Sequence, residues 1–231
     1  MWKTAIRLIA LIAASVASTA ANAQPACSTP NDNSCAAYTG CIEKNCRCDS
    51  TASKYVVQFG FKYCQRFAAE MRFSGAGQSW RDKTLRCLRD EIAKSYVQNS
   101  QPCNCAKIQA DAIASHNKCY TIAPSFCSLN DSDIKVVARI VDIGDALALG
   151  RPGFIETAKT LVVCHTQVGV TRGAQIAGVF LLETLDEGRE MARNYVIQVA
   201  EEGRIYAIAK GLPQVAKKFE ELRDSLKPVL P

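Results

Sequence analysis

The sequence offers few residues that could support catalysis. Only two histidines occur, His116 and His165, so an acid–base mechanism built on an imidazole must use one of them. The motifs H-E-x-x-H, G-x-S-x-G, G-x-x-x-x-G-K-[ST] and G-x-G-x-x-G, which mark metalloproteases, serine hydrolases, phosphate loops and dinucleotide sites, do not occur in the chain. We therefore expect no catalytic residues, no cofactor and no enzyme activity.

The Cys164–His165 step is similar to the Cys-His step of secreted phospholipases A2, which are also helical and disulfide-rich. Thr166 stands where that family has an aspartate, and no glycine-rich calcium loop lies upstream. We therefore interpret His165 as a solvent-exposed or capping residue. A secreted hydrolase or lipid-active protein that uses His165 is the alternative function.

Two C-x-C pairs could bind a metal ion. Four thiolates, from Cys46, Cys48, Cys103 and Cys105, could converge on a tetrahedral zinc ion. C-x2-C is the commoner zinc spacing, however, and cysteines of exported proteins are usually oxidised. We therefore expect disulfides here and no metal.

A cluster of carboxylates could bind calcium. Four acidic residues share one face of a predicted helix: Glu183, Asp186, Glu187 and Glu190. Arg189 and Arg193 lie beside them, and the turn-rich loop that calcium sites usually need is missing. We interpret the group as a solvated helix face.

The N-terminus predicts export. Lys3 and Arg7 precede an apolar run, residues 8–14, and small residues then lead to Ala21-Asn22-Ala23. This order is typical of a secretory signal peptide, and the run is too short to cross a membrane. We place cleavage after Ala23, so residues 1–23 are the signal peptide and the mature chain is secreted, or periplasmic if the source is a Gram-negative bacterium.

The charge of the mature chain points to no particular partner. The full chain has 28 Lys and Arg and 22 Asp and Glu, and removal of Lys3 and Arg7 leaves 26 basic groups, a net charge of 26 − 22 = +4. Basic and acidic residues alternate along most predicted helices instead of forming a basic face. We expect no nucleic-acid partner.

The twelve cysteines indicate a disulfide framework, because an even number of cysteines in an exported chain is normally paired. They stand at positions 27, 35, 41, 46, 48, 64, 87, 103, 105, 119, 127 and 164. No cysteine follows Cys164, so the sequence divides into a Cys-rich body, 24–165, and a Cys-free segment, 166–231.

Apolar spacing in the body is helical. Residues 24–49 have no sustained periodicity and predict short turns and helical fragments, whereas aromatic residues at helical spacing predict a helix from Tyr55 to Met71, ended by the glycines at 75 and 77. Ser79 is the expected N-cap of the next helix, in which Trp80 begins an apolar stripe. We expect Trp80 and the tyrosines of these two helices to be packed in the core and not to form a ligand cage.

The remaining elements are also predicted to be helical. A third helix is expected over 104–118, a fourth capped by Asp131 or Ser132, and a fifth starting at Pro152. Nothing in the body is typical of a strand. The expected fold is all-α, a disulfide-stapled helical bundle with an additional C-terminal helical segment.

The C-terminal segment is amphipathic. Its apolar block, 174–182, is too short to span a bilayer, so we expect the segment to pack on the body or on a partner chain, as in a non-covalent homodimer. Contact of residues 175–226 with a membrane surface is the alternative.

The order and spacing of the cysteines resemble the stanniocalcins, which are secreted, helical, disulfide-rich glycoprotein hormones. Short strings beside the cysteines carry the resemblance: Lys62-Tyr63-Cys64-Gln65-Arg66-Phe67, Gly77-x-x-Trp80, Thr84-Leu85-Arg86-Cys87-Leu88 and Lys118-Cys119-Tyr120. The likeness spans residues 27–164. It implies a non-enzymatic, hormone-like or regulatory protein with an extracellular protein partner or receptor, linked to calcium and phosphate homeostasis.

The resemblance also implies a disulfide pairing. The implied bridges are Cys27–Cys41, Cys35–Cys64, Cys87–Cys119 and Cys127–Cys164, with Cys46–Cys105 and Cys48–Cys103 or the exchanged pairing of these four. The family has a further cysteine that links two subunits, and this chain has none after Cys164, which puts a covalent dimer in doubt. The one glycosylation sequon begins at Asn130.

Overall fold

The fold is seen in a computed structural model that describes residues 27, 35–99, 102–185 and 190–226. The predicted signal peptide, 1–23, and the predicted new N-terminus lie outside these residues. The described residues form helices and turns with no strand, which confirms the all-α, disulfide-stapled fold. None of the helices described has both the length and the apolar character needed to cross a membrane.

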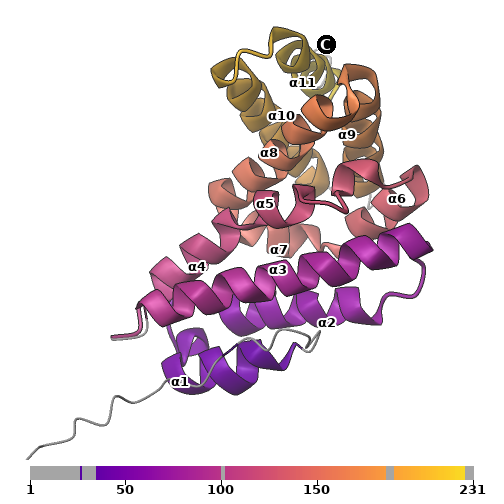
Figure 1. The fold of residues 1–231 in the computed structure, drawn as a ribbon. Coiled ribbons are helices and arrows are strands. Elements are labelled where there is room, and N and C mark those ends of the chain that lie inside the picture. The colour runs from indigo at the N-terminus through magenta and orange to yellow at the C-terminus, as the bar shows by residue number, and fades with distance from the viewer. Residues whose placement is uncertain (1–26, 28–34, 100–101, 186–189, 227–231) are drawn as a thin grey trace, which may run out of the picture.

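Short helical turns precede longer helices along the chain (Figure 1). The elements are η1 Ala37–Glu43, α1 Lys44–Cys46, η2 Cys48–Ser50, η3 Val56–Phe61, α2 Lys62–Ala69, α3 Gly75–Asn99, α4 Cys105–Ala114, α5 His116–Thr121, η4 Phe126–Ser128, α6 Asp131–Ile140, α7 Ile143–Ala148, α8 Gly150–Val168, α9 Val170–Leu185, α10 Glu190–Ala209 and α11 Pro213–Ser225. The helix predicted over 104–118 is thus two helices, α4 and α5.

Asparagine side chains start two of the helices. Asn104 accepts a hydrogen bond from a backbone amide in the first turn of α4 (3.0 Å), and Asn130 does the same for α6 (2.8 Å). The prediction that Asp131 or Ser132 caps α6 is therefore wrong by one or two residues. Asn130 has extended backbone, which is the geometry that lets a side-chain oxygen reach the first free amides.

The junction between α2 and α3 also differs from the prediction. The glycines at 75 and 77 begin α3 instead of ending the preceding helix, and the hydroxyl of Ser79 donates within the helix to the carbonyl of Gly75 (3.0 Å). Ser74 is the residue that caps α3, because its Oγ accepts from the amide of Gly77 (3.2 Å). Buried Asp133 of α6 in turn accepts from the amide and the hydroxyl of Ser74 (2.8 and 2.6 Å).

Six disulfides use all twelve cysteines. They are Cys27–Cys41, Cys35–Cys64, Cys46–Cys103, Cys48–Cys105, Cys87–Cys119 and Cys127–Cys164. The crossed pairing Cys46–Cys105 with Cys48–Cys103 is thus wrong, and the exchanged pairing is found. The first cysteine of one C-x-C pair bonds to the first of the other pair, and the second bonds to the second. These two disulfides, Cys46–Cys103 and Cys48–Cys105, are here called the tandem bridges, and both close loops of the same length.

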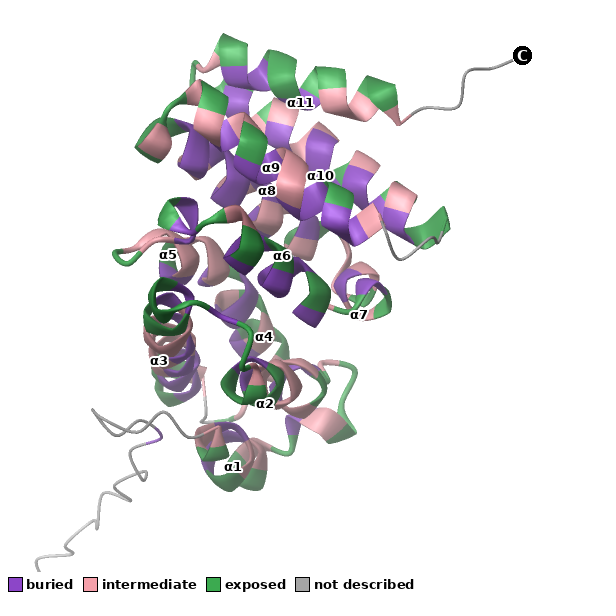
Figure 2. Cartoon of the chain, turned by 90° about the vertical axis from the view of Figure 1, so that its right-hand side faces the viewer, coloured by how far each residue is buried: buried purple, intermediate pink, exposed green. Residues whose placement is uncertain are grey.

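The C-terminal segment packs on the body. Helix α8 lies between α5 and α10, α9 packs on α6 and α8, and α11 packs on α10. Ile176, Phe180 and Val196 of this segment belong to the same hydrophobic core as the body, and Figure 2 shows the buried faces of α8, α9 and α10 meeting in the interior. Met191 and Ile205 of α10 are exposed (45% and 43%).

Candidate functional site

The two C-x-C pairs do not form a metal site. All four cysteines are oxidised in the tandem bridges, which leaves no thiolate for zinc. No group of three or more potential metal ligands comes together elsewhere in the described part of the chain.

The carboxylate cluster is not a solvated face where the structure describes it. Glu183 is buried and forms ion pairs with Arg139 and Lys135 of α6, so it ties α9 to α6. Glu190 is exposed at the start of α10. Asp186 and Glu187 lie outside the described residues.

His165 is buried, which corrects the expectation of an exposed or capping residue. Its side chain is only 3% exposed, its Nδ1 bonds to the carbonyl of Leu161 (2.9 Å), and its ring packs against Phe219 of α11 (5.6 Å between ring centres). Nε2 has no hydrogen-bond partner in the described part of the chain, and burial lowers the pKa of the imidazole. An imidazole enclosed in this way cannot meet a substrate without opening the helix packing.

Asn130 is exposed at the start of α6. Its side-chain oxygen is used in the helix cap, and its amide nitrogen makes no hydrogen bond that would hold it in the interior. Glycosylation of Asn130 stays a prediction.

A cavity of about 140 Å³, partly open to solvent, lies between the disulfide-rich N-terminal elements and the helices α5 to α10. Its apolar lining comprises Phe59, Phe67, Trp80, Leu85, Leu88, Ile113, Phe126, Val137, Val141, Ala146, Leu149, Leu161 and Phe180. Half-buried Phe59 and Leu149 mark the side of the lining nearer to solvent. A second pocket, beside Cys103 and Cys105, is more open and has a smaller apolar wall.

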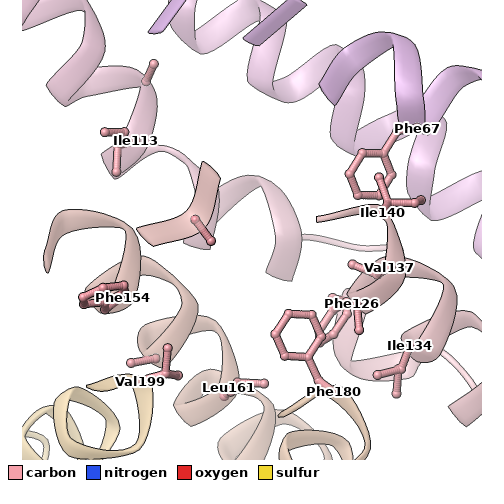
Figure 3. Packing of buried hydrophobic residues seen from close by; sticks show 14 of the residues in the cluster. Phe67, Ile113, Phe126, Ile134, Val137, Ile140, Phe154, Leu161, Phe180 and Val199 are labelled. Atoms are coloured by element: carbon pink, nitrogen blue, oxygen red, sulfur yellow. The ribbon is translucent and has the colours of Figure 1, made fainter. Parts of the chain in front are cut away.

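Aromatic rings in mutual contact form much of the wall. Phe126 of η4 meets Phe180 of α9 edge to face (6.0 Å) and lies 5.8 Å from the ring of Trp80 in α3. Figure 3 shows Phe126 and Phe180 side by side beneath Val137 of α6, with Leu161 of α8 nearby. The wall therefore combines residues of five elements, α3, η4, α6, α8 and α9, and includes the C-terminal segment through Phe180.

Tyrosine hydroxyls are the main polar groups of the cavity. Tyr63 donates to Asp145 of α7 (2.7 Å) and accepts from a backbone amide, and Tyr195 of α10 hydrogen-bonds to Thr157 (3.1 Å). The hydroxyls of three others make no hydrogen bond to any residue that the structure describes. These three are Tyr38, Tyr55 and Tyr120.

The two charged lining residues already have partners. Glu156 of α8 is buried, forms an ion pair with Lys159 (2.7 Å) and accepts from the backbone amide of Asn117 (3.3 Å). Arg81 of α3 donates to Asp82 (2.8 Å) and to a backbone carbonyl. Each of these two charges is therefore balanced by an oppositely charged side chain of the protein.

His116 also lines the cavity. Its Nδ1 bonds to the last carbonyls of α4, of Ala112 and Ile113 (2.9 and 3.0 Å), so it caps the C-terminus of that helix. Burial lowers the pKa of this imidazole, and its ring packs edge-on against Tyr120 (5.5 Å). His116 is therefore a neutral part of the wall at pH 7.

Sequence reasoning found several of the lining residues without finding the cavity. Trp80, Tyr55 and Tyr63 are buried or half-buried, as helical spacing predicts, but they also face an open space. Spacing identifies the inward face of a helix and carries no information on whether the opposite layer fills the space. That the hydroxyls of three tyrosines have no hydrogen-bond partner among the described residues can be recognised only from the structure.

Comparison with protein-family models, with curated proteins and with solved structures found no match. The resemblance to the stanniocalcins therefore stays a prediction that rests on the cysteines and their flanking strings.

Proposed function

We propose that this chain is an exported, non-enzymatic binding protein that holds a small apolar molecule in the cavity. The observation that carries the proposal is the cavity of about 140 Å³ with its aromatic and aliphatic wall. Natural interiors are packed to the density of organic crystals, so a space of this size inside a small domain is unusual. An engineered apolar cavity of about 150 Å³ is large enough to bind benzene, which sets the scale of the ligand.

The positions of both histidines support a non-catalytic role. His116 and His165 each bond to backbone carbonyls, and burial lowers the pKa of both imidazoles. A general base must reach a substrate proton, and His165 lies behind α11. The alternative of a hydrolase that uses His165 thus has no accessible imidazole at that position.

The six disulfides support export to an oxidising compartment, where such frameworks persist. A hormone-like role with an extracellular protein partner, a non-covalent homodimer through the C-terminal helices and contact of that segment with membranes stay predictions.

Trp80 provides a direct test of the proposal. It lines the cavity and is the only tryptophan of the predicted mature chain, since Trp2 lies in the signal peptide. We expect ethylbenzene, added to the purified exported protein, to shift the Trp80 emission with saturation. Unfolding should move to higher temperature in parallel, because a ligand that binds only the folded state stabilises it by about 1.4 kcal/mol at ten times its Kd.

The control is a peptide amide of tryptophan at the same ethylbenzene concentrations, which reports effects of the solvent alone. Emission that changes linearly with ethylbenzene, together with an unchanged unfolding temperature, would refute ligand binding in the cavity.

A further inference from the structure

We infer that the ligand is a neutral molecule with one hydrogen-bond-accepting oxygen, which the hydroxyls of Tyr38, Tyr55 and Tyr120 bind. This inference rests on the proposed function, because it assigns the ligand chemistry of the same cavity. A purely apolar ligand would fill the space but would leave the three hydroxyls without partners.

The first observation is the contrast among the five tyrosines that line the cavity. Tyr63 and Tyr195 have hydroxyls held by protein groups, at 2.7 and 3.1 Å. Tyr38 of η1, Tyr55 just before η3 and Tyr120 of α5 have none within the described residues, although all three rings are buried or half-buried. The three hydroxyls are not among the buried polar atoms that lack a partner, so each opens onto the cavity, where a ligand oxygen can accept a hydrogen bond from it.

The three tyrosines line the same cavity. Burial raises the pKa of Tyr55, and the neighbouring phenols of Tyr38 and Tyr120 raise it further. Tyr38 shows the same effect: burial raises its pKa, Arg89 opposes the shift, and Tyr120 adds to it. The three groups are therefore protonated at neutral pH and available as donors to a ligand in the cavity.

Packing holds the three rings in place. Tyr38 lies directly over Gly60, where an added Cβ would come within 2.5 Å of its ring. Tyr55 stacks on Phe59 with nearly parallel planes (5.9 Å, 2°), and Tyr120 meets Trp80 edge to face (5.7 Å). Donors that are fixed before binding lose little conformational freedom when an acceptor arrives.

Charge in the cavity favours a neutral acceptor over a carboxylate. Glu156 places a carboxylate in the wall, and Arg81 is already bonded to Asp82. Arg89 lies outside the lining and pairs with Asp90 (3.3 Å). A buried anionic ligand would lose its hydration beside the carboxylate of Glu156, whereas the oxygen of a ketone, ester or alcohol loses little and can accept the same phenol hydrogen bonds.

The test compares three ligands of nearly the same size: ethylbenzene, acetophenone and benzoate. Isothermal titration calorimetry at neutral pH should show that acetophenone binds about tenfold tighter than ethylbenzene, the upper range for one net hydrogen bond. Benzoate should bind more weakly than acetophenone, by at least about tenfold.

Variants identify the donors. Tyr55→Phe, Tyr38→Phe and Tyr120→Phe each keep the ring and remove a hydroxyl with no protein partner, so the fold should be retained and thermal unfolding checks this. Each variant should reduce the preference for acetophenone over ethylbenzene, and the triple variant should abolish it while ethylbenzene binds as before. Tyr206→Phe, on α10 outside the cavity, is the matched control and should keep the full preference.

The outcomes separate this inference from the proposed function. Equal affinity for ethylbenzene and acetophenone in the unmodified protein, or a preference that survives in the triple variant, overturns the tyrosine inference and leaves the cavity as an apolar site. Tightest binding of benzoate overturns the neutral class of ligand. Failure of all three compounds to bind overturns the proposed function itself.

Discussion

Filling the cavity from α7 should make the protein more stable and unable to bind its ligand. Ala146 is buried and its methyl group lines the cavity, so a leucine at this position extends into the open space. Three additional buried carbons contribute at most about 2.4 kcal/mol, at about 0.8 kcal/mol each. Ordering the leucine side chain costs about 0.5–1 kcal/mol, which leaves a net gain of about 1.5 kcal/mol in the free energy of unfolding for Ala146→Leu.

Urea unfolding with the disulfides intact measures this gain, and titration with ethylbenzene on the same preparation measures binding. Ala148→Leu is the matched control, because Ala148 is exposed on the same helix and the same change there should alter neither quantity by more than about 0.5 kcal/mol. A cavity that the protein uses for a ligand predicts opposite signs for stability and binding. Loss of stability in Ala146→Leu together with unchanged ethylbenzene affinity would refute the reasoning.

Three further predictions concern the framework. Replacing one tandem bridge by alanines should cost about 2 kcal/mol, because the other still closes the loop between residues 57 apart, whereas removing both should cost about 6 kcal/mol. Additive losses in urea unfolding would contradict the closure of one shared loop by both bridges. Burial lowers the pKa of both His165 and His116 from 6.5, so the unfolded chain binds more protons and stability should fall as pH drops below about 6.5. His165→Leu should reduce this dependence in thermal unfolding and leave the part due to His116, and an unchanged slope would exclude His165 as a source. Gly173→Ala should lower the unfolding temperature, because the added Cβ would lie 2.5 Å from the backbone of His165. Gly178→Ala is the control and should have no such effect, because the space around Gly178 is open. Equal effects of the two substitutions would show that α8 and α9 are not in this close contact.

The helical fold could be predicted because its signals are local. The spacing of aromatic residues before Met71 depends on neighbours in the sequence, and the even number of cysteines can be counted without knowledge of the fold. The wrongly predicted start of α3 is a place where a tertiary contact determines where the helix begins. Asp133 binds Ser74 and so starts α3 before Ser79, and no local signal reports a partner about 60 residues away.

The candidate site was less predictable for the same reason. His165 and Glu183 have residue types that are commonly exposed, and their burial depends on helices that cross them from elsewhere in the chain. Glu183 is buried because α6 supplies Arg139 and Lys135 opposite it. The pairing of the tandem bridges also depends on the tertiary structure. Two C-x-C pairs that face each other allow either pairing, and the relative direction of the two segments decides between them.

The disulfide framework explains how a hollow interior can persist in this fold. A cavity of about 140 Å³, at about 24 cal/mol per Å³, costs about 3 kcal/mol relative to a filled core. The first of the tandem bridges alone contributes about 4 kcal/mol by restricting a loop between residues 57 apart in the unfolded chain. The bridge therefore offsets the cavity without occupying it, and Cys64, which lines the cavity, bonds to Cys35 and holds η1 and α2 around the open space. Covalent stabilisation of the fold therefore compensates for incomplete packing around the open space.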